Sequence, residues 1–192
     1  MSYAHLVTPV AKTNATGDAV GMPQYQATLL IPKSDVATKV AIDQAIQTAA
    51  QAALATKWGG LMPPQVHTTL YDGDGIKESG ELWGDECRGH WILRAKSIHK
   101  PGAIDSAGND LLPTDIYSGM YARASLDFYG YKHKDSGKKG VGCGINNIMK
   151  TRDGEAFSGS APATTDFAEL LQQPNPNAWG APAQPQANPF AT

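Results

Sequence analysis

Apolar and polar residues alternate between Gln24 and Ile31, which is the first regular pattern in the chain. Such alternation is typical of a half-buried β-strand, because successive side chains of a strand point to opposite faces. Pro32 is expected to end the strand, since it cannot donate to a strand ladder. The apolar face would hold Tyr25, Ala27, Leu29 and Ile31.

A helical pattern follows, from Ser34 to a stop at 57–60, where the sequence reads Lys-Trp-Gly-Gly. Ser34 is the expected N-cap, and the Ala- and Gln-rich run behind it predicts a helix of about 22 residues. Apolar residues at helical spacing would form its buried face: Val36, Val40, Ile46, Ala50 and Leu54.

No period continues between Leu61 and Gly89, because prolines and a turn-rich run interrupt every pattern. We expect a loop with short strands. The acids of this segment resemble part of a calcium-binding loop, but they lack the ligand spacing of an EF-hand. A surface turn without a metal ion is therefore the expected structure for Asp72, Asp74, Glu78 and Glu81.

The second half of the chain predicts three more strands, at 90–98, 120–128 and about 141–150. In the first of them, Trp91, Leu93 and Ala95 would face the core, with Arg94 and Lys96 on the opposite face. The second has the clearest alternation. Its inward residues would be Met120, Ala122, Ala124, Leu126 and Phe128, and its outward residues Tyr121, Arg123, Ser125, Asp127 and Tyr129.

Strands, one long helix and turns of uneven length predict a mainly β fold, a small closed or nearly closed barrel. The chain has 192 residues and 41% hydrophobic content, enough for one domain with a core. We place that domain at 1–157. Residues 158–192 are rich in Pro, Ala, Gln and Asn without a period, which predicts a flexible tail.

The remaining composition indicates a soluble cytoplasmic protein. Cys87 and Cys143 form no CxxC pair, so we expect two reduced, partly buried thiols rather than a zinc site or a disulfide. The N-terminus lacks the pattern of a signal peptide, and no run approaches the roughly 18 apolar residues of a membrane span.

Charge is distributed unevenly along the chain. The net charge is −2, yet residues 1–152 carry 16 basic and 14 acidic residues, a net charge of +2. Between Arg123 and Arg152 there are seven basic residues and two acids, a local net charge of +5. A polyanion would sense this local excess at close range, because salt screens charges beyond about 8 Å.

Aromatic and basic side chains share one predicted strand face. Single-stranded nucleic acid needs this combination, since cations follow phosphates and flat rings stack on unpaired bases. Ordinary solvated lysines, with tyrosines packed under loops, would give the same pattern. The candidate contacts are Tyr121, Arg123, Tyr129, Tyr131, Lys132, Lys138, Lys139 and Lys150, extended by Arg94 and Lys96 if the two basic strands are neighbours.

Signatures of catalysis are weak by comparison. The five histidines form no HxxxH or HxH pair, and neither a phosphate-binding loop nor a GxSxG motif occurs. We expect no enzyme activity, no cofactor and no metal ion. Trp58, Trp83 and Trp91 are expected in the core.

The chain also resembles a known family through five segments in order. They are LLIPK (29–33), YDGDG (71–75), IYSGMYARASLDFYGY (116–131), KKGVGCGINNIMKTRDGE (138–155) and TTDF (164–167). The family consists of single-stranded DNA-binding proteins of tailed phages with an OB fold, a five-stranded Greek-key barrel. The resemblance implies a role in phage replication or recombination in the cytoplasm of the infected bacterial host.

Two hypotheses of different classes follow. In the first, the barrel binds single-stranded DNA with little sequence preference and duplex DNA weakly; it would self-associate on DNA and contact replication or recombination proteins through the tail. In the second, it is a structural or adaptor protein that uses the same barrel for protein contacts.

Overall fold

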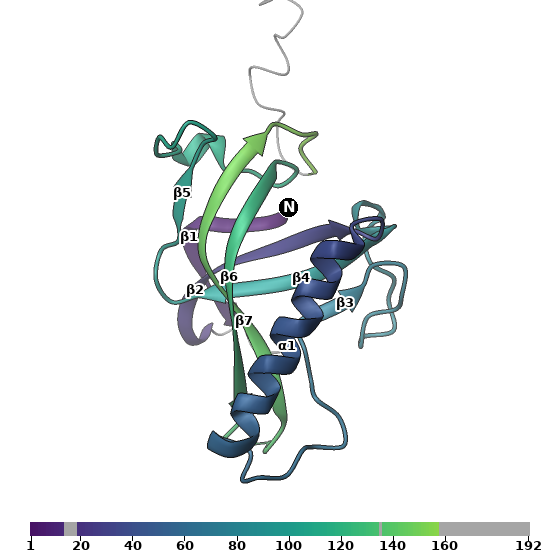
Figure 1. Cartoon of the computed structure of the whole chain (residues 1–192). Helices are drawn as coiled ribbons and strands as arrows, with labels where there is room; N and C mark the ends of the chain where they lie inside the picture. The colour runs from purple at the N-terminus through teal and green to yellow at the C-terminus, as the bar shows by residue number, and fades with distance from the viewer. Residues whose placement is uncertain (14–18, 135, 158–192) are drawn as a thin grey trace, which may run out of the picture. The chain divides into compact units, whose positions relative to one another are not determined.

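The computed structural model of the chain describes residues 1–13, 19–134 and 136–157. In these described residues, one long helix and two short 3-10 helices are inserted among seven strands, arranged as in Figure 1. The strands are β1 (Ser2–Thr13), β2 (Ala19–Pro32), β3 (Leu70–Asp72), β4 (His90–Ser97), β5 (Gly102–Ile104), β6 (Tyr121–Lys132) and β7 (Lys139–Arg152). The helices are α1 (Val36–Thr56), η1 (Asp85–Cys87) and η2 (Pro113–Asp115).

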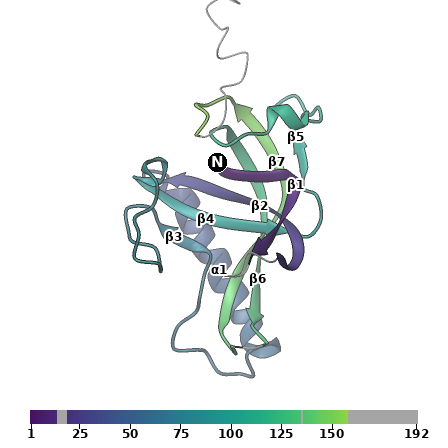
Figure 2. The same cartoon turned by 180° about the vertical axis from the view of Figure 1, so that it is seen from behind.

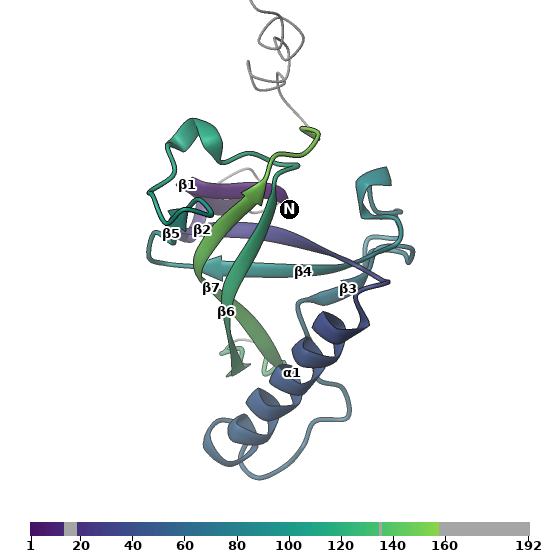
Figure 3. The same ribbon diagram turned by 45° about the horizontal axis from the view of Figure 1, so that its top comes forward.

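The strands form one curled sheet. β1, β2 and β4 pair antiparallel in that order, β4 meets β7 in parallel at Lys96 and Gly144, and β6 pairs antiparallel with β7 along its whole length. The start of the chain is bound to the residues just before β6, because Gly119 N donates to Met1 O at 2.8 Å and the Met1 amino group donates to Met120 O at 3.1 Å. Figure 3 shows the N-terminus beside the start of β6, with β2 and β4 crossing behind the β6–β7 hairpin.

Alternation places the core as predicted for three strands. Leu93 and Ala95 of β4 and Met120 before β6 are fully buried, and they pack with Ala27 and Ile31 of β2 in one cluster. On β6, the even-numbered residues from Ala122 to Phe128 are half-buried, and the odd-numbered residues from Tyr121 to Tyr129 are exposed. The predictions for 24–31, 90–98 and 120–128 are therefore confirmed.

Helix α1 is confirmed in length, and Ala50 is buried as predicted, but the predicted cap and the predicted burial of Val36 and Val40 are wrong. Asp35, not Ser34, is the N-cap: its carboxylate accepts from Thr38 N at 3.1 Å. Val36 and Val40 are 63% and 47% exposed, because the helix packs against the sheet only from its second turn onward. The residues that are buried there are Ile42, Ala49, Ala50 and Ala53.

Small residues allow the helix to approach the β6–β7 hairpin closely, as Figure 1 also shows. A Cβ atom on Gly130 of β6 would lie 2.1 Å from Ala53 Cβ and 3.3 Å from Ala49 O. The C-terminal end of α1 is fastened to the same strand, since Trp58 Nε1 donates to Tyr131 O at 2.9 Å and Lys57 Nζ to Gly130 O at 2.8 Å.

Two strands were not predicted. β1 has irregular register with β2, and β5 has only three residues, so neither shows a sustained period of two. Cys87 and Cys143 are buried free thiols, as predicted, and burial raises the pKa of Cys143 to about 12. Within the part of the chain that the structure describes, no helix has the length and apolar character needed to cross a bilayer. The predicted tail at 158–192 lies outside the described residues.

We expect Gly130→Ala to lower the free energy of unfolding by roughly 1–3 kcal/mol, because an added methyl group would force the helix away from the hairpin. Gly144→Ala is the control, since its added Cβ would meet no atom closer than 3.5 Å. Urea unfolding followed by circular dichroism measures both. Equal stability of the two variants would contradict this description of the helix contact.

Candidate nucleic-acid interface

The outward face of the β6–β7 hairpin carries the predicted aromatic and basic residues. Tyr121 and Tyr129 are 48% and 44% exposed, and Arg123 lies between them on the same face. Tyr131 continues the row and is half-buried. We call Tyr121, Arg123, Tyr129 and Tyr131 the hairpin face.

Two tyrosines of the hairpin face, Tyr129 and Tyr131, lie over glycines. Tyr129 pairs with Gly142 and Tyr131 with Gly140 across the ladder. A Cβ atom on Gly142 would be 2.8 Å from Tyr129 Cζ, and one on Gly140 would be 2.6 Å from the Tyr131 hydroxyl. The far ends of both rings therefore rest on the backbone of β7. This contact holds the far end of each ring against β7, while Tyr129 remains 44% exposed and Tyr131 half-buried.

Tyr121 has a different neighbourhood. The guanidinium carbon of Arg152 lies 3.4 Å from the centre of its ring, a cation–π contact. Tyr129 lies eight positions after Tyr121, which corresponds to about 26 Å along a strand. The two exposed tyrosines thus lie far apart on the hairpin face, and Tyr131 lies beyond Tyr129.

Lysines cluster around the turn that joins β6 to β7, as predicted. Lys132, Lys134 and Lys138 are exposed there. Lys139 instead braces the fold, because its ammonium group donates to Trp58 O at 2.8 Å and to Leu61 O at 3.2 Å.

Lys150 is also engaged by the protein. Its ammonium group pairs with Asp153 at 2.7 Å, donates to Asp115 O at 3.0 Å, and lies 5.0 Å from the centre of the Tyr117 ring. A phosphate contact by Lys139 or Lys150 would have to compete with these partners.

Arg94 and Lys96 lie on the outward face of β4, opposite Thr28 and Gln26 of β2. The two basic strands are not direct neighbours, because β7 lies between β4 and β6. Seen from behind, β1, β2 and β4 lie in front of α1 (Figure 2). A groove of about 310 Å³ crosses them, lined by His5, Gln26, Ala27, Thr28, Arg94, Ala95 and Lys96.

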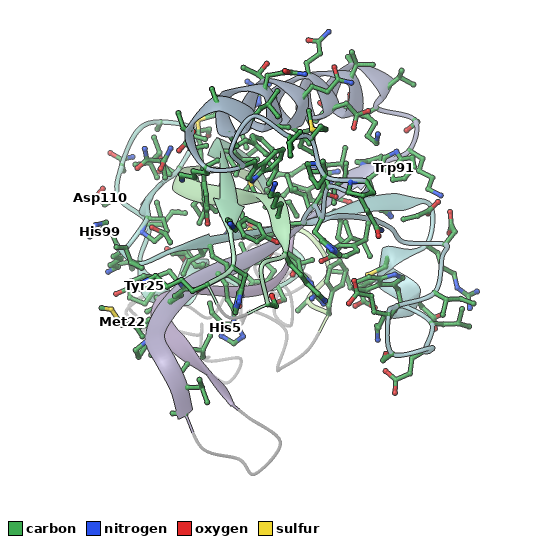
Figure 4. The ribbon with its side chains drawn as sticks, turned by 90° about the horizontal axis from the view of Figure 1, so that it is seen from below. His5, Met22, Tyr25, Trp91, His99 and Asp110 are labelled. Carbon is green, nitrogen blue, oxygen red and sulfur yellow. The ribbon has the colours of Figure 1, made fainter. Side chains whose placement is uncertain are left out.

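A second hollow, of about 470 Å³, continues this groove past Gln26 and Lys96 toward Val20 and Met22. Met22 is 76% exposed, and Figure 4 shows it beside the β1–β2 hairpin, on the same side of the barrel as Tyr25 and His99. Trp91 lies on the opposite side, near α1 (Figure 4).

Two aromatic residues near Arg94 were not predicted as site residues. The rings of Tyr71 and Trp83 lie 5.5 Å apart, and the guanidinium of Arg94 is 5.5 Å and 5.2 Å from their centres. Trp83 was expected in the core. It is half-buried and belongs to neither of the two buried clusters in the described residues, because its polar loop carries it to the surface. Trp58, by contrast, is 3% exposed and lies in the core.

The aspartates of the predicted turn bind a lysine of their own chain. Lys33 Nζ lies 2.5 Å from Asp72 and 2.6 Å from Asp74, and these contacts hold the pKa of both carboxyl groups below the usual range. Among the residues described, no three His, Cys, Asp or Glu side chains gather in a way that could hold a metal ion.

Comparison with known proteins assigns the chain to a family. The model of the Enterobacter phage Enc34 ssDNA-binding protein family matches residues 1–176. The chain belongs to this family. The fold also matches the Enc34 single-stranded DNA-binding protein solved in complex with ssDNA, at 24% identity over 82% of this chain and 84% of that protein, with a TM-score of 0.67. The mainly β, OB-type fold expected from the resemblance is therefore confirmed, although the described residues form a seven-stranded open sheet rather than a five-stranded barrel.

Two further relatives fit this assignment. A protein of Acyrthosiphon pisum secondary endosymbiont phage 1 is 27% identical over 151 residues, covering 76% of this chain and 78% of its own length. The single-stranded DNA-binding protein gp2.5 of bacteriophage T7 shares the fold at 14% identity, with a TM-score of 0.51 over 83% of this chain and 91% of that protein.

Lys139→Met should destabilise the protein by roughly 1–2 kcal/mol, because it removes a charged donor from two carbonyl groups at the end of α1. Lys138→Met should leave stability unchanged, since Lys138 is exposed on the adjacent position. Thermal unfolding of the two variants provides the comparison. The same melting temperature for both would show that Lys139 does not brace the fold.

Proposed function

We propose that the chain binds single-stranded DNA without catalysing a reaction. The observation that carries the proposal is the row of tyrosines held over glycines on the hairpin face, beside exposed lysines. Ring faces stack on any unpaired base, and lysines contact phosphates whatever the sequence. Binding with little sequence preference follows from both contacts, and family membership supports the same function.

The proposed contacts divide by chemistry. Tyr129, Tyr131 and Tyr121 stack on bases. Phosphates meet Arg123 of the hairpin face, Arg94 and Lys96 in the groove, and three exposed lysines at the hairpin turn: Lys132, Lys134 and Lys138. Lys139 and Lys150 are weaker candidates for phosphate contacts, because protein groups already bind their ammonium groups.

Duplex DNA should bind more weakly, since its stacked bases are not free to meet the tyrosine rings. The relatives are phage proteins, and we propose that this chain acts in replication or recombination inside the infected bacterial cell. Contacts with phage replication or recombination proteins through 158–192, and self-association on DNA, belong to the same proposal.

The main test is a titration of fluorescent oligo-dT at several salt concentrations. We expect the affinity to fall as the salt concentration rises. Each phosphate contact on a single strand should add about 0.7 to the magnitude of the slope of log affinity against log salt concentration. Tyr129→Ala should weaken binding by roughly 1–3 kcal/mol, the cost of one lost base stack. Tyr129→Phe, which keeps the ring, should bind like the wild type. A folded Tyr129→Ala protein with wild-type affinity would place the stacking face elsewhere, and equal affinity for a duplex of the same length would contradict a single-strand preference.

Gly142→Ala tests the support beneath Tyr129. The added methyl group would collide with the far end of the Tyr129 ring and with no backbone atom closer than 3 Å, so the ring should tilt while the fold persists. We expect affinity for oligo-dT to fall toward that of Tyr129→Ala, with little change in melting temperature. Gly144→Ala lies two residues further along the same face and meets only ordinary contacts, so it should bind like the wild type. Identical affinities of the two alanine variants would mean that ring placement does not matter.

A further inference from the structure

Tyr71 and Trp83, which we call the ring pair, form an aromatic surface outside the hairpin face. Tyr71 comes from β3, which pairs with β4 opposite Ile92, and Trp83 comes from the loop between those strands. The rings are tilted by 46° and touch each other, so no base can enter between them. Both residues are half-buried. Lys77 Nζ lies 5.5 Å from the centre of the Trp83 ring and 3.8 Å from Glu81, so a base that stacks on Trp83 would have to share the ring with this lysine or displace it.

The loop that carries Trp83 is fastened at several points. Gly73 N donates to His90 O at 2.9 Å, Gly89 N donates to Asp74 at 2.9 Å, and Lys77 N donates to Glu81 O at 2.8 Å. Gly73 is required for this closure, because a Cβ atom there would lie 2.0 Å from Cys87 O. The ring pair is thus held in place before any ligand arrives, which lowers the entropy cost of binding.

Arg94 links the ring pair to the groove over β2 and β4. Its guanidinium lies over both rings, and Arg94 is also one of the residues that line the 310 Å³ groove, next to Lys96. The ring pair is connected to the hairpin face as well. His67, four residues before Tyr71, forms a β-bridge with Gly140 of β7, and Gly140 pairs with Tyr131 of β6. The segment that leads into β3 therefore runs beside the end of the tyrosine row.

The charge of the loop limits what the ring pair can bind. Between Gly73 and Gly89 the sequence has five acids and two bases, a net charge of −3. Phosphates would be repelled by this loop, so any contact with a nucleic acid must be made by a base on a ring. The cation that meets the adjacent phosphate is Arg94, on the strand rather than in the loop.

From these contacts we infer that the ring pair is a second base-stacking site, which receives a base of the same single strand that lies on the hairpin face. Trp83 provides the stacking surface, and Arg94 both holds the rings and neutralises the neighbouring phosphate. The inference rests on the proposed function and extends the path of the strand from the hairpin face, past Tyr131, to β3 and β4.

The test uses Trp83→Ala and Arg94→Met in the full chain, titrated with oligo-dT at several salt concentrations. Trp83→Ala should lower affinity about 5-fold or more, the range for one lost stack, without changing the salt slope. Arg94→Met should lower affinity and also reduce the magnitude of the slope by about 0.7, because one phosphate contact is lost. Leu82→Ala is the matched control, since Leu82 is the 64% exposed neighbour of Trp83 in the same loop.

A folded Trp83→Ala protein that binds oligo-dT like Leu82→Ala would overturn the inference. If Trp83→Ala does not fold, Trp83→Phe is measured in its place. Oligo-dT should quench the tryptophan fluorescence of the wild type more than that of Trp83→Phe, because Trp83 is the residue in contact with a base, and equal quenching would overturn the inference. Failure of the proposed function is a separate result, namely loss of salt-dependent binding by the wild type or no effect of Tyr129→Ala.

Discussion

The close contact between α1 and the β6–β7 hairpin is the constraint on which the proposed interface depends. A hairpin of this length extends beyond the barrel, and its inner face would be solvated if the alanines of α1 did not cover it. Gly130 permits that approach, and Trp58 and Lys57 donate to the carbonyl groups of the strand at the same level. Because α1 holds the inner face of β6 in place, Tyr129 and Tyr131 on its outer face keep a fixed position against β7.

Glycines on β7 make room for tyrosine rings on the outer face of the hairpin. Alternation would normally place side chains at 140, 142 and 144 beside the tyrosines and Asp127 of β6. With no side chain there, the rings of Tyr131 and Tyr129 lie down on the backbone instead of standing beside a neighbour. Ordering a glycine in a strand is unfavourable in conformational entropy, and the packing of the ring against it offsets part of this effect. The glycines that weaken the strand thus also allow a flat aromatic surface to form.

Sequence patterns predicted the elements whose burial follows a simple period. Alternation at 120–128 was sufficient to orient every residue of β6 up to Phe128, because one face of that strand meets the core and the other meets solvent. The buried face of α1 could not be derived in the same way. Alanines bury as well as valines when glycine lies opposite, and the sequence alone does not show that Gly130 is the partner of Ala53. β1 and β5 were missed for a related reason, since irregular register and short length leave no period to detect.

The site was predictable only where chemistry and period coincide. Tyr121, Arg123 and Tyr129 share one strand face, so their common orientation follows from alternation. Tyr71, Trp83 and Arg94 come from a strand of three residues, an aperiodic loop and a third segment, and only tertiary structure brings them together. Net charge is equally uninformative, because the negative charge lies partly in the loop that carries Trp83, while the bases gather at the hairpin turn. The lysines of the hairpin turn would attract a polyanion that meets this surface, and the acids of the Trp83 loop would repel it. A base would therefore reach Trp83 only when the phosphates of the same strand are bound by β4 and β6.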